Sequence, residues 1–402
     1  MVEFCPFEGF LPKLKDESIS DRVSPPYDVI DDREMNRLKG LRFNVARITL
    51  GGENGRYPKA ASELEKWVRE GAIVKDERES FYLYRQSFQL KGERFTRTGL
   101  VGLLHLEPYE KGIVLPHEET NPDVKEDRLN LLRATEAHLE SILGLYKGED
   151  VDIQKLLAGD CVELYRFEDD TGTLHTFSRV TDRAVADRMT TIMRKKKILI
   201  ADGHHRYETA LRYSMEDPAD ARRRWILATL VESADPGLLV FPTHRVLRGP
   251  AGFEETLVQT LAEDFELTQV DDPRELETCR KPGVRSMGLM LNDQSMYRCE
   301  LKSRPSNDPL WDIDSYVFEE LVRRKLLDST GLGRSVKMSY NHDMSAISRK
   351  LSAGEFSATF ILRAPSMEDI WKVTESGRLM PRKTTYFWPK IWSGFVFHLL
   401  GH

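Results

Sequence analysis

A short apolar run followed at once by Asp-Gly constrains this chain more than any other feature of its sequence. Ile198-Leu199-Ile200-Ala201 predicts a short buried strand. Asp202-Gly203 predicts a tight turn, because glycine allows backbone conformations and close approaches that other residues do not. A helix is predicted from about Arg206 to Met215. The chain therefore contains a strand-turn-helix unit.

The start of that helix has the chemistry of an anion-binding site. Its first N–H groups lack intrahelical acceptors and lie at the positive end of the helix dipole, which favours phosphate oxygens. His204, His205 and Arg206 add side-chain donors, and arginine can bind a phosphate with two hydrogen bonds. Asp202 could accept a proton from an attacking hydroxyl or help to hold a metal ion bound to the phosphates. We therefore predict that Gly203 to Arg206 binds nucleotide phosphates.

The same residues also have a simpler interpretation. An Asp-Gly pair between a strand and a helix often only caps the helix. Adjacent histidines such as His204 and His205 point in different directions on regular structure, so the pair does not favour a metal site with two histidine ligands.

Three further clusters carry reactive or anion-binding side chains. They are Pro116-His117-Glu118-Glu119, Pro242-Thr243-His244-Arg245 and Arg382-Lys383-Thr384-Thr385. Each can be a helix cap, a strand end or a solvated loop instead. The sequence alone does not place them near one another.

The length of 402 residues indicates two or three domains. The predicted organisation is an N-terminal α/β region at 1–110, a core at 111–249, and a C-terminal α/β domain at 250–402 after Gly249-Pro250. Paired strands are predicted at 80–90 and 97–106, strands around a turn at 161–180, and single strands at 225–231 and 358–362. Helices are predicted at 57–71, from about residue 125, at 182–195, 258–265, 316–327 and 366–375. The expected fold class is mixed α/β.

Charge and cysteine content narrow the function. The net charge is -6, which argues against a DNA-binding protein, although the basic runs 194–197 and 222–224 exist. The four cysteines, Cys5, Cys161, Cys279 and Cys299, form no CxxC pair, so neither zinc nor redox chemistry is indicated. No apolar run is long enough to span a membrane, and the acidic, proline-bearing start does not resemble a signal peptide. A cytoplasmic protein is expected.

The run Asp202-Gly203-His204-His205-Arg206 resembles the phosphate-binding signature of the ParB/sulfiredoxin superfamily. More specifically, the chain is similar to the free serine kinase branch, on three blocks in the same order. They are Leu115-Pro116-His117-Glu118, the run just named, and the stretch from Phe360 to Thr385. The chain also resembles a large bacterial and archaeal family labelled as a domain of unknown function. This second likeness rests on Ser24-Pro25-Pro26-Tyr27-Asp28, Lys125-Glu126-Asp127-Arg128 and Thr384-Thr385-Tyr386-Phe387.

The kinase resemblance implies a role for particular residues. Glu118 falls on the catalytic glutamate, and Asp202 on the aspartate near the reacting hydroxyl. Gly203, His204, His205 and Arg206 fall on the nucleotide-phosphate loop, and Lys383 and Thr385 on residues that hold serine. One departure is Phe387, where the kinase has a histidine.

The resulting hypothesis is phosphoryl transfer from ATP or ADP, with Mg²⁺, to the hydroxyl of free L-serine or a similar small metabolite. Glu118 would be the base. One alternative is a ParB-like nucleotide switch or DNA-associated factor, but no helix-turn-helix follows Met215. A sulfiredoxin-like enzyme would need a cysteine at His204. A non-catalytic interaction protein, in which the turn only caps a helix, is the third alternative.

Overall fold

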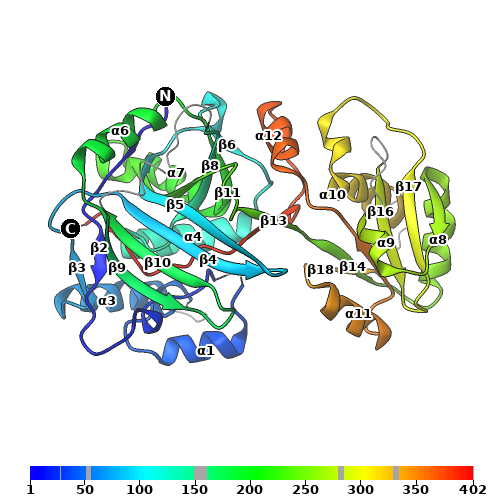
Figure 1. Ribbon diagram of the computed structural model, residues 1–402, viewed down its shortest axis with the longest axis horizontal. Coiled ribbons are helices and arrows are strands. Elements are labelled where there is room, and N and C mark those ends of the chain that lie inside the picture. The colour runs from blue at the N-terminus through cyan, green and yellow to red at the C-terminus, as the bar shows by residue number, and fades with distance from the viewer. Residues whose placement is uncertain (28, 51–55, 149–160, 279–284, 329–334, 402) are drawn as a thin grey trace. The chain divides into compact units, whose positions relative to one another are not determined.

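The computed structural model describes residues 1–27, 29–50, 56–148, 161–278, 285–328 and 335–401. Asp28 of the predicted Pro-Pro-Tyr-Asp turn and Cys279 lie outside these ranges. The chain forms two compact units (Figure 1). Unit 1 contains Met1–Pro116, Thr120–Leu239 and Pro389–His402, and unit 2 contains His117–Glu119 and Val240–Trp388. Both units combine helices with sheets, so the mixed α/β class is confirmed.

A large mixed sheet forms the centre of unit 1. Within the described residues its strand order is β6-β11-β8-β12-β5-β4-β10-β9, with β1 paired to β5. The strands are β1 (Phe4–Cys5), β4 (Tyr82–Leu90), β5 (Glu93–His105), β6 (Val114–Pro116), β8 (Ile142–Tyr146), β9 (Cys161–Glu168), β10 (Leu174–Val180), β11 (Ile198–Asp202) and β12 (Trp225–Glu232). β11 runs parallel to β6 and antiparallel to β8, while β12 runs parallel to β8. The alternating residues of β4 and β5 form the long antiparallel pair that their sequence predicts.

Side-chain caps mark the start of several helices of unit 1. They are α1 (Asp32–Gly40), α2 (Ala46–Thr49), α3 (Arg56–Arg69), α4 (Pro122–Thr135), α6 (Arg183–Met193) and α7 (His204–Glu216), with short 3-10 turns η1 (Ile19–Asp21), η2 (Tyr109–Lys111) and η3 (Ala221–Arg224). The Asn121 side chain caps α4, which has Pro122 in its first turn, and Asp182 caps α6. α4 therefore starts three residues before the predicted Lys125.

Two apolar clusters stabilise unit 1. The larger one joins the sheet to α7 through buried residues such as Ile198, Ile200 and Tyr207. A second cluster packs α2 and α3 against α4, around the buried side chains of Trp67 and Leu131. It also includes residues of two small strand pairs, β2 (Phe10–Pro12) with β3 (Ile73–Lys75) and β7 (Ala137–His138) with β21 (His398–Leu399).

Unit 2 is built on a six-stranded sheet with the order β15-β17-β16-β19-β14-β18. Its strands are β14 (His244–Arg248), β15 (Phe265–Gln269), β16 (Ser286–Leu291), β17 (Met296–Leu301), β18 (Lys337–Asn341) and β19 (Ala358–Ile361); β13 (Leu239–Pro242) and β20 (Thr385–Trp388) form a separate pair. Its helices are α8 (Phe253–Asp264), α9 (Pro273–Thr278), η4 (Pro309–Asp312), α10 (Asp314–Val317), the π-helix η5 (Phe318–Asp328), α11 (Met344–Ser352) and α12 (Met367–Glu375). Ser366 and Asp369 form a reciprocal capping box on α12.

Strand pairing joins segments that the sequence-based prediction assigns to different regions. β4 and β5 come from the predicted region 1–110, yet β5 pairs with β12 of the predicted core. The three predicted regions therefore stay a prediction, and the observed units cut across them. The helix predicted at 258–265 differs at both ends, because the helix α8 covers Phe253–Asp264 and Phe265 begins β15.

Candidate functional site

A left-handed glycine makes the turn between β11 and α7. Gly203 has φ 90° and ψ 27°, and the helix begins at His204, two residues earlier than expected. A Cβ atom at Gly203 would lie 2.9 Å from Ile142 Cγ2 and 3.0 Å from Arg206 Nη2. The predicted strand-turn-helix unit is therefore present, and both the backbone conformation and the neighbouring side chains require glycine there.

Arg206 lies against this turn. Its Nη1 donates to the Ser141 carbonyl at 2.6 Å, and its Nη2 lies 4.0 Å from Asp202 Oδ1. The side chain is only 15% exposed. The guanidinium is thus held beside the start of α7, where it adds positive charge to that of the helix dipole.

Asp202, the last residue of β11, has a second cationic neighbour that the sequence did not indicate. Lys390 Nζ lies 2.6 Å from Asp202 Oδ2, and both groups belong to unit 1. Burial opposes ionisation of the Asp202 carboxyl, but Lys390 and Arg206 outweigh it and lower its pKa. This carboxyl stays ionised and is already paired with two cations. It is therefore better suited to keep its negative charge than to accept a proton.

A buried polar chain supports the backbone of Lys390. Gln86 Nε2 donates to the Lys390 carbonyl at 2.8 Å, and Arg97 donates to the Gln86 side-chain carbonyl. Gln86 and Arg97 are both 1% exposed, and burial lowers the pKa of Arg97 to about 10. These contacts connect β4 and β5 to the C-terminal segment and so fix the backbone from which the Lys390 side chain extends.

The two histidines of the turn have different surroundings. His204 is 8% exposed. His205 Nε2 accepts a hydrogen bond from the Asn121 backbone N–H at 2.9 Å, so this nitrogen carries no proton in this geometry. His205 thereby joins the start of α7 to the start of α4.

A second cluster lies in unit 2 and contains the other predicted site residues. Glu118 Oε2 accepts from the Lys383 backbone N–H at 2.7 Å, and Glu118 Oε1 accepts from Thr385 Oγ1 at 3.0 Å. Both carboxylate oxygens are thus held by residues 265 and 267 positions away. The structure brings Glu118, Lys383 and Thr385 together, although it is the backbone of Lys383 that contacts the carboxylate.

The buried His117 completes this cluster. Its Nε2 lies 2.8 Å from Thr385 Oγ1 and 3.2 Å from Glu118 Oε1. Since the Thr385 hydroxyl donates to Glu118, the imidazole N–H is the donor to that hydroxyl. Phe387 is buried and packs edge-on against His117, with 5.7 Å between ring centres.

The loop that carries Lys383 is held in an uncommon conformation. Lys383 has φ 59°, which side chains other than glycine rarely adopt. Arg245 Nη1 donates to the Lys383 carbonyl at 3.0 Å and to the Thr243 carbonyl at 2.6 Å. The Thr243-His244-Arg245 run, which could have bound an anion, instead provides a buried arginine that holds this loop.

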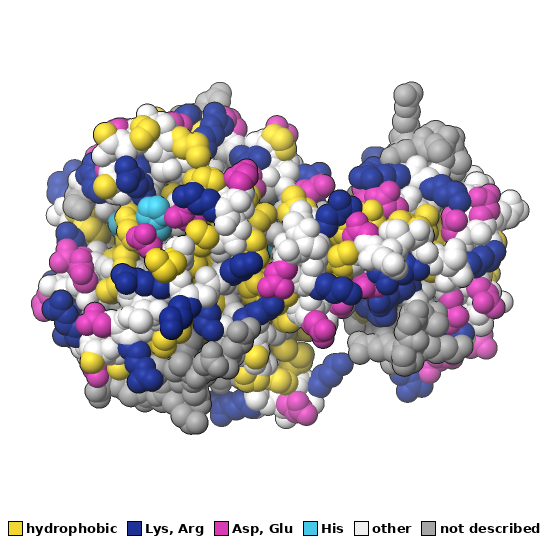
Figure 2. Space-filling view, turned by 90° about the horizontal axis from the view of Figure 1, so that it is seen from above, with side chains coloured by type: hydrophobic (Ala, Val, Ile, Leu, Met, Phe, Trp, Pro, Cys, Tyr) yellow, Lys and Arg dark blue, Asp and Glu magenta, His cyan; other side chains and the backbone are white. Residues whose placement is uncertain are grey.

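The described residues contain no group of three or more His, Cys, Asp or Glu side chains arranged to hold a metal ion. None of the helices in the described ranges is long and apolar enough to cross a membrane. On the face seen in Figure 2, acidic and basic side chains are interspersed rather than separated by sign.

The class that fold and site define is a mixed α/β protein with a glycine turn at a helix start and a separate hydrogen-bonded glutamate cluster. The chain belongs to the family described as "Protein of unknown function (DUF1015)", whose model matches residues 4–317. The predicted likeness to a family of unknown function is thereby confirmed. No curated protein sequence matches the chain.

Three solved structures illustrate what the chain is similar to. A conserved hypothetical protein from Pyrococcus furiosus is 16% identical, with a TM-score of 0.39, over 72% of this chain and 93% of that one. A free serine kinase in complex with AMP is 16% identical, with a TM-score of 0.39, over 69% and 84%. SbnI with a C-terminal truncation, from Staphylococcus aureus, is 12% identical, with a TM-score of 0.37, over 74% and 86%. At these values the likenesses assign no activity to this chain.

Proposed function

We propose that the protein is a phosphotransferase that moves a phosphoryl group from ATP or ADP to the hydroxyl of a small metabolite, with L-serine as the first candidate. The product from serine would be O-phosphoserine. The observation that carries this proposal is the Glu118 carboxylate, whose two oxygens are held by the Thr385 hydroxyl and the Lys383 amide. A carboxylate fixed in this way is a suitable general base for a hydroxyl acceptor.

The turn in unit 1 would bind the donor. Phosphoryl transfer depends mainly on positioning and on charge neutralisation. The first-turn N–H groups of α7 and the guanidinium of Arg206 supply donors and positive charge beside Gly203, and Lys390 adds a second cation. Arg206 and Lys390 keep Asp202 ionised. Its negative charge would hold these two cations in place at the donor site.

The cluster in unit 2 would act on the acceptor. Glu118 would take the proton of the acceptor hydroxyl, while Thr385 and Lys383 would hold the amino acid, the Lys383 ammonium pairing with its carboxylate. The His117 N–H, which donates to the Thr385 hydroxyl, would keep that hydroxyl directed at Glu118. His117 would thus be a positioning residue.

Mg²⁺ would accompany the donor nucleotide, because it is commonly held by one or two carboxylates together with substrate phosphates rather than by a full protein cage. Asp202, with 25% of its side chain exposed, is the carboxylate that would contribute. When bound, the ion would neutralise charge on the transferring phosphates.

A direct assay tests the proposal. The full chain would be incubated with Mg²⁺, ATP or ADP, and a panel of hydroxyl-bearing amino acids and metabolites, with detection of the phosphorylated acceptor. Glu118→Gln should lower kcat by about 10² or more, since general-base catalysis contributes about 10² to 10⁴. The matched control is Glu119→Gln, next in sequence and exposed.

Three results would count against the proposal. The first is nucleotide hydrolysis without a phosphorylated acceptor, which would favour a nucleotide switch. The second is full activity of a folded Glu118→Gln variant, and the third is absence of any thermal shift with ATP, ADP or CTP.

A further inference from the structure

A large cavity in unit 1 lies among α1, α2 and α3, away from the residues of the Gly203 turn. Its volume is about 780 Å³, which is within the range of about 300–1,000 Å³ typical of sites for small organic ligands. Its lining residues are Met35, Asn36, Lys39, Arg47, Ile48, Leu50, Arg56, Lys59, Ala60, Ser62, Glu63 and Leu131. Neither Asp202 nor Arg206 is among them.

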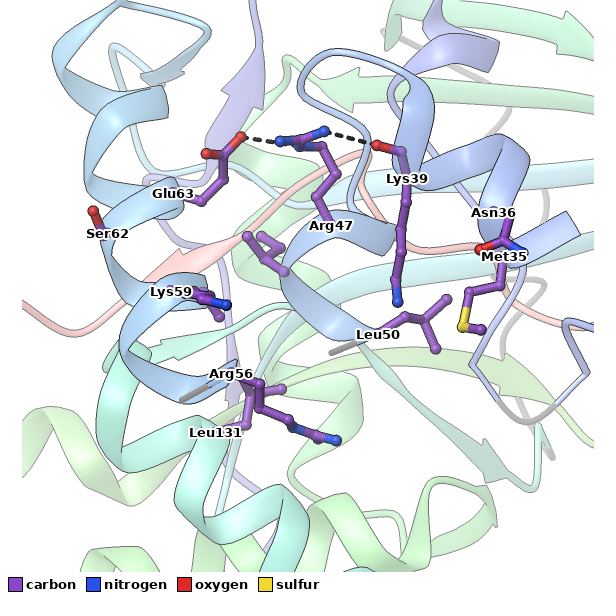
Figure 3. A pocket seen from close by; sticks show the side chains of 12 residues that line it. Met35, Asn36, Lys39, Arg47, Leu50, Arg56, Lys59, Ser62, Glu63 and Leu131 are labelled. Atoms are coloured by element: carbon purple, nitrogen blue, oxygen red, sulfur yellow. Dashed lines mark hydrogen bonds and ion pairs between the residues drawn. The ribbon is translucent and has the colours of Figure 1, made fainter. Parts of the chain in front are cut away.

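The charges around this cavity are predominantly positive. Four lysines and arginines line it against one carboxylate, Glu63. That carboxylate is already neutralised, because Arg47 Nε donates to Glu63 Oε1 at 3.0 Å. Figure 3 shows the charged ends of Lys39, Lys59 and Arg56 directed into the space from different sides.

These cations differ in their availability. Arg56 also pairs with Asp127, at 2.7 Å, outside the cavity. Lys39 and Lys59 form no ion pair with any residue in the described ranges. Two ammonium groups thus face one cavity without an acidic partner from the described part of the chain, an arrangement that an anionic ligand would stabilise.

The rest of the wall is apolar. Ile48 and Leu131 are buried at 1% and 7% exposure, and Met35, Leu50 and Ala60 add further hydrocarbon surface. Such a wall gains free energy by covering an apolar ligand body, which a simple inorganic anion does not have.

We propose that this cavity is a binding site for an amphiphilic organic anion, with one or two phosphate or carboxylate groups held by Lys39 and Lys59 and an apolar body on Ile48, Leu50 and Leu131. The site is separate from the proposed nucleotide turn and does not depend on the proposed phosphotransferase activity.

The probe is 8-anilinonaphthalene-1-sulfonate, an aromatic anion whose fluorescence rises when it binds. The full chain would be titrated as wild type, as the double variant Lys39→Gln/Lys59→Gln, and as the matched control Arg33→Gln/Lys66→Gln. The control removes two positive charges from the same helices, α1 and α3, at positions that do not line the cavity. All three proteins should have equal Tm, because both lysines are at least partly exposed.

We expect the wild type and the control to bind alike and the cavity variant to bind about fivefold to tenfold more weakly. The affinity of the wild type should fall as salt rises. Dodecanoate and phenyl phosphate as competitors distinguish a carboxylate from a phosphate head group, and displacement by either supports the site. Equal binding by all three proteins, or failure of both competitors to displace the probe, would overturn the proposal.

Discussion

Lys390→Gln tests the charge balance at the centre of the unit 1 site. The wild-type ammonium lies 2.6 Å from Asp202 Oδ2, and the two side chains are 14% and 25% exposed. Coulomb's law with an effective dielectric constant of about 20 gives roughly 6 kcal/mol of gross attraction at that distance. The desolvation of both ions offsets most of it. Loss of one partner from a fully buried pair costs about 3–5 kcal/mol, and an exposed pair contributes about 0–1. We therefore expect Lys390→Gln to lower the free energy of unfolding by about 2 kcal/mol at pH 7.

The pH dependence of the stability difference between Lys390→Gln and wild type is a second test of the same ion pair. The folded-state pKa of Asp202 lies below its ordinary value of 3.8, so its ion pair stabilises the fold above that pH. The stabilisation is lost as pH falls through the lowered pKa, where the folded carboxyl also binds a proton. Removal of Lys390 raises the pKa of Asp202. The difference between variant and wild type should therefore be full at pH 7 and shrink in acid.

Urea unfolding followed by tryptophan fluorescence measures the effect in a double-mutant cycle of Lys390→Gln, Asp202→Asn and both together. The double variant should be less destabilised than the sum of the single variants, with a coupling of about 1–3 kcal/mol. A coupling below about 0.5 kcal/mol, or a Lys390→Gln effect that is the same at pH 7 and pH 3, would refute the reasoning.

Three other predictions follow from the same site and its surroundings. Gly203→Ala should lower Tm more than Gly172→Ala, because both have positive φ but only the first meets neighbouring atoms; equal losses would contradict this. Arg206→Gln should weaken nucleotide binding at least about tenfold by calorimetry, while Arg212→Gln, 58% exposed on the same helix, should not. Burial lowers the pKa of His398 from 6.5 to about 4, so this histidine alone should lower stability by up to about 1.4 kcal/mol per pH unit as pH drops from 6.5 to 4. His398→Phe should remove this part of the slope in a thermal-melt series, while His138 and His244, whose pKa values are also lowered by burial, keep theirs.

Local signals in the sequence predicted much of the architecture. Ile198 to Ala201 is a buried strand, and Gly203 makes the turn, because an apolar run and a glycine act through short-range physics. The strand pair at 80–90 and 97–106 and the helix that begins after its N-cap Ser366 follow from the same kind of local signal. The grouping of β5 with β12 was not, since strand pairing across more than a hundred residues leaves no local pattern.

The site residues also divide into features that local patterns predict and features that only the folded chain shows. Glu118, Lys383 and Thr385 were selected by their types and by resemblance, and their hydrogen bonds show that they form one cluster. No local pattern indicates that Lys383 contacts Glu118 through its backbone. That contact depends on the left-handed φ of Lys383 and on the buried Arg245, which are properties of the folded loop.

Lys390 shows why a motif alone is insufficient to assign protonation roles. Its neighbours Pro389 and Ile391 give no sign of a site, and its position depends on Gln86 and Arg97, which lie on strands 304 and 293 residues earlier in the chain. By sequence alone, Asp202 could either accept a proton or help to hold a metal ion, because it lies next to a helix start. With Lys390 at 2.6 Å and Arg206 nearby, its proton affinity is lowered, which disfavours the first role. Glu118 accepts hydrogen bonds from the Thr385 hydroxyl and the Lys383 amide, so both of its oxygens are fixed in position, and its role as the proton acceptor stays a prediction that Glu118→Gln tests.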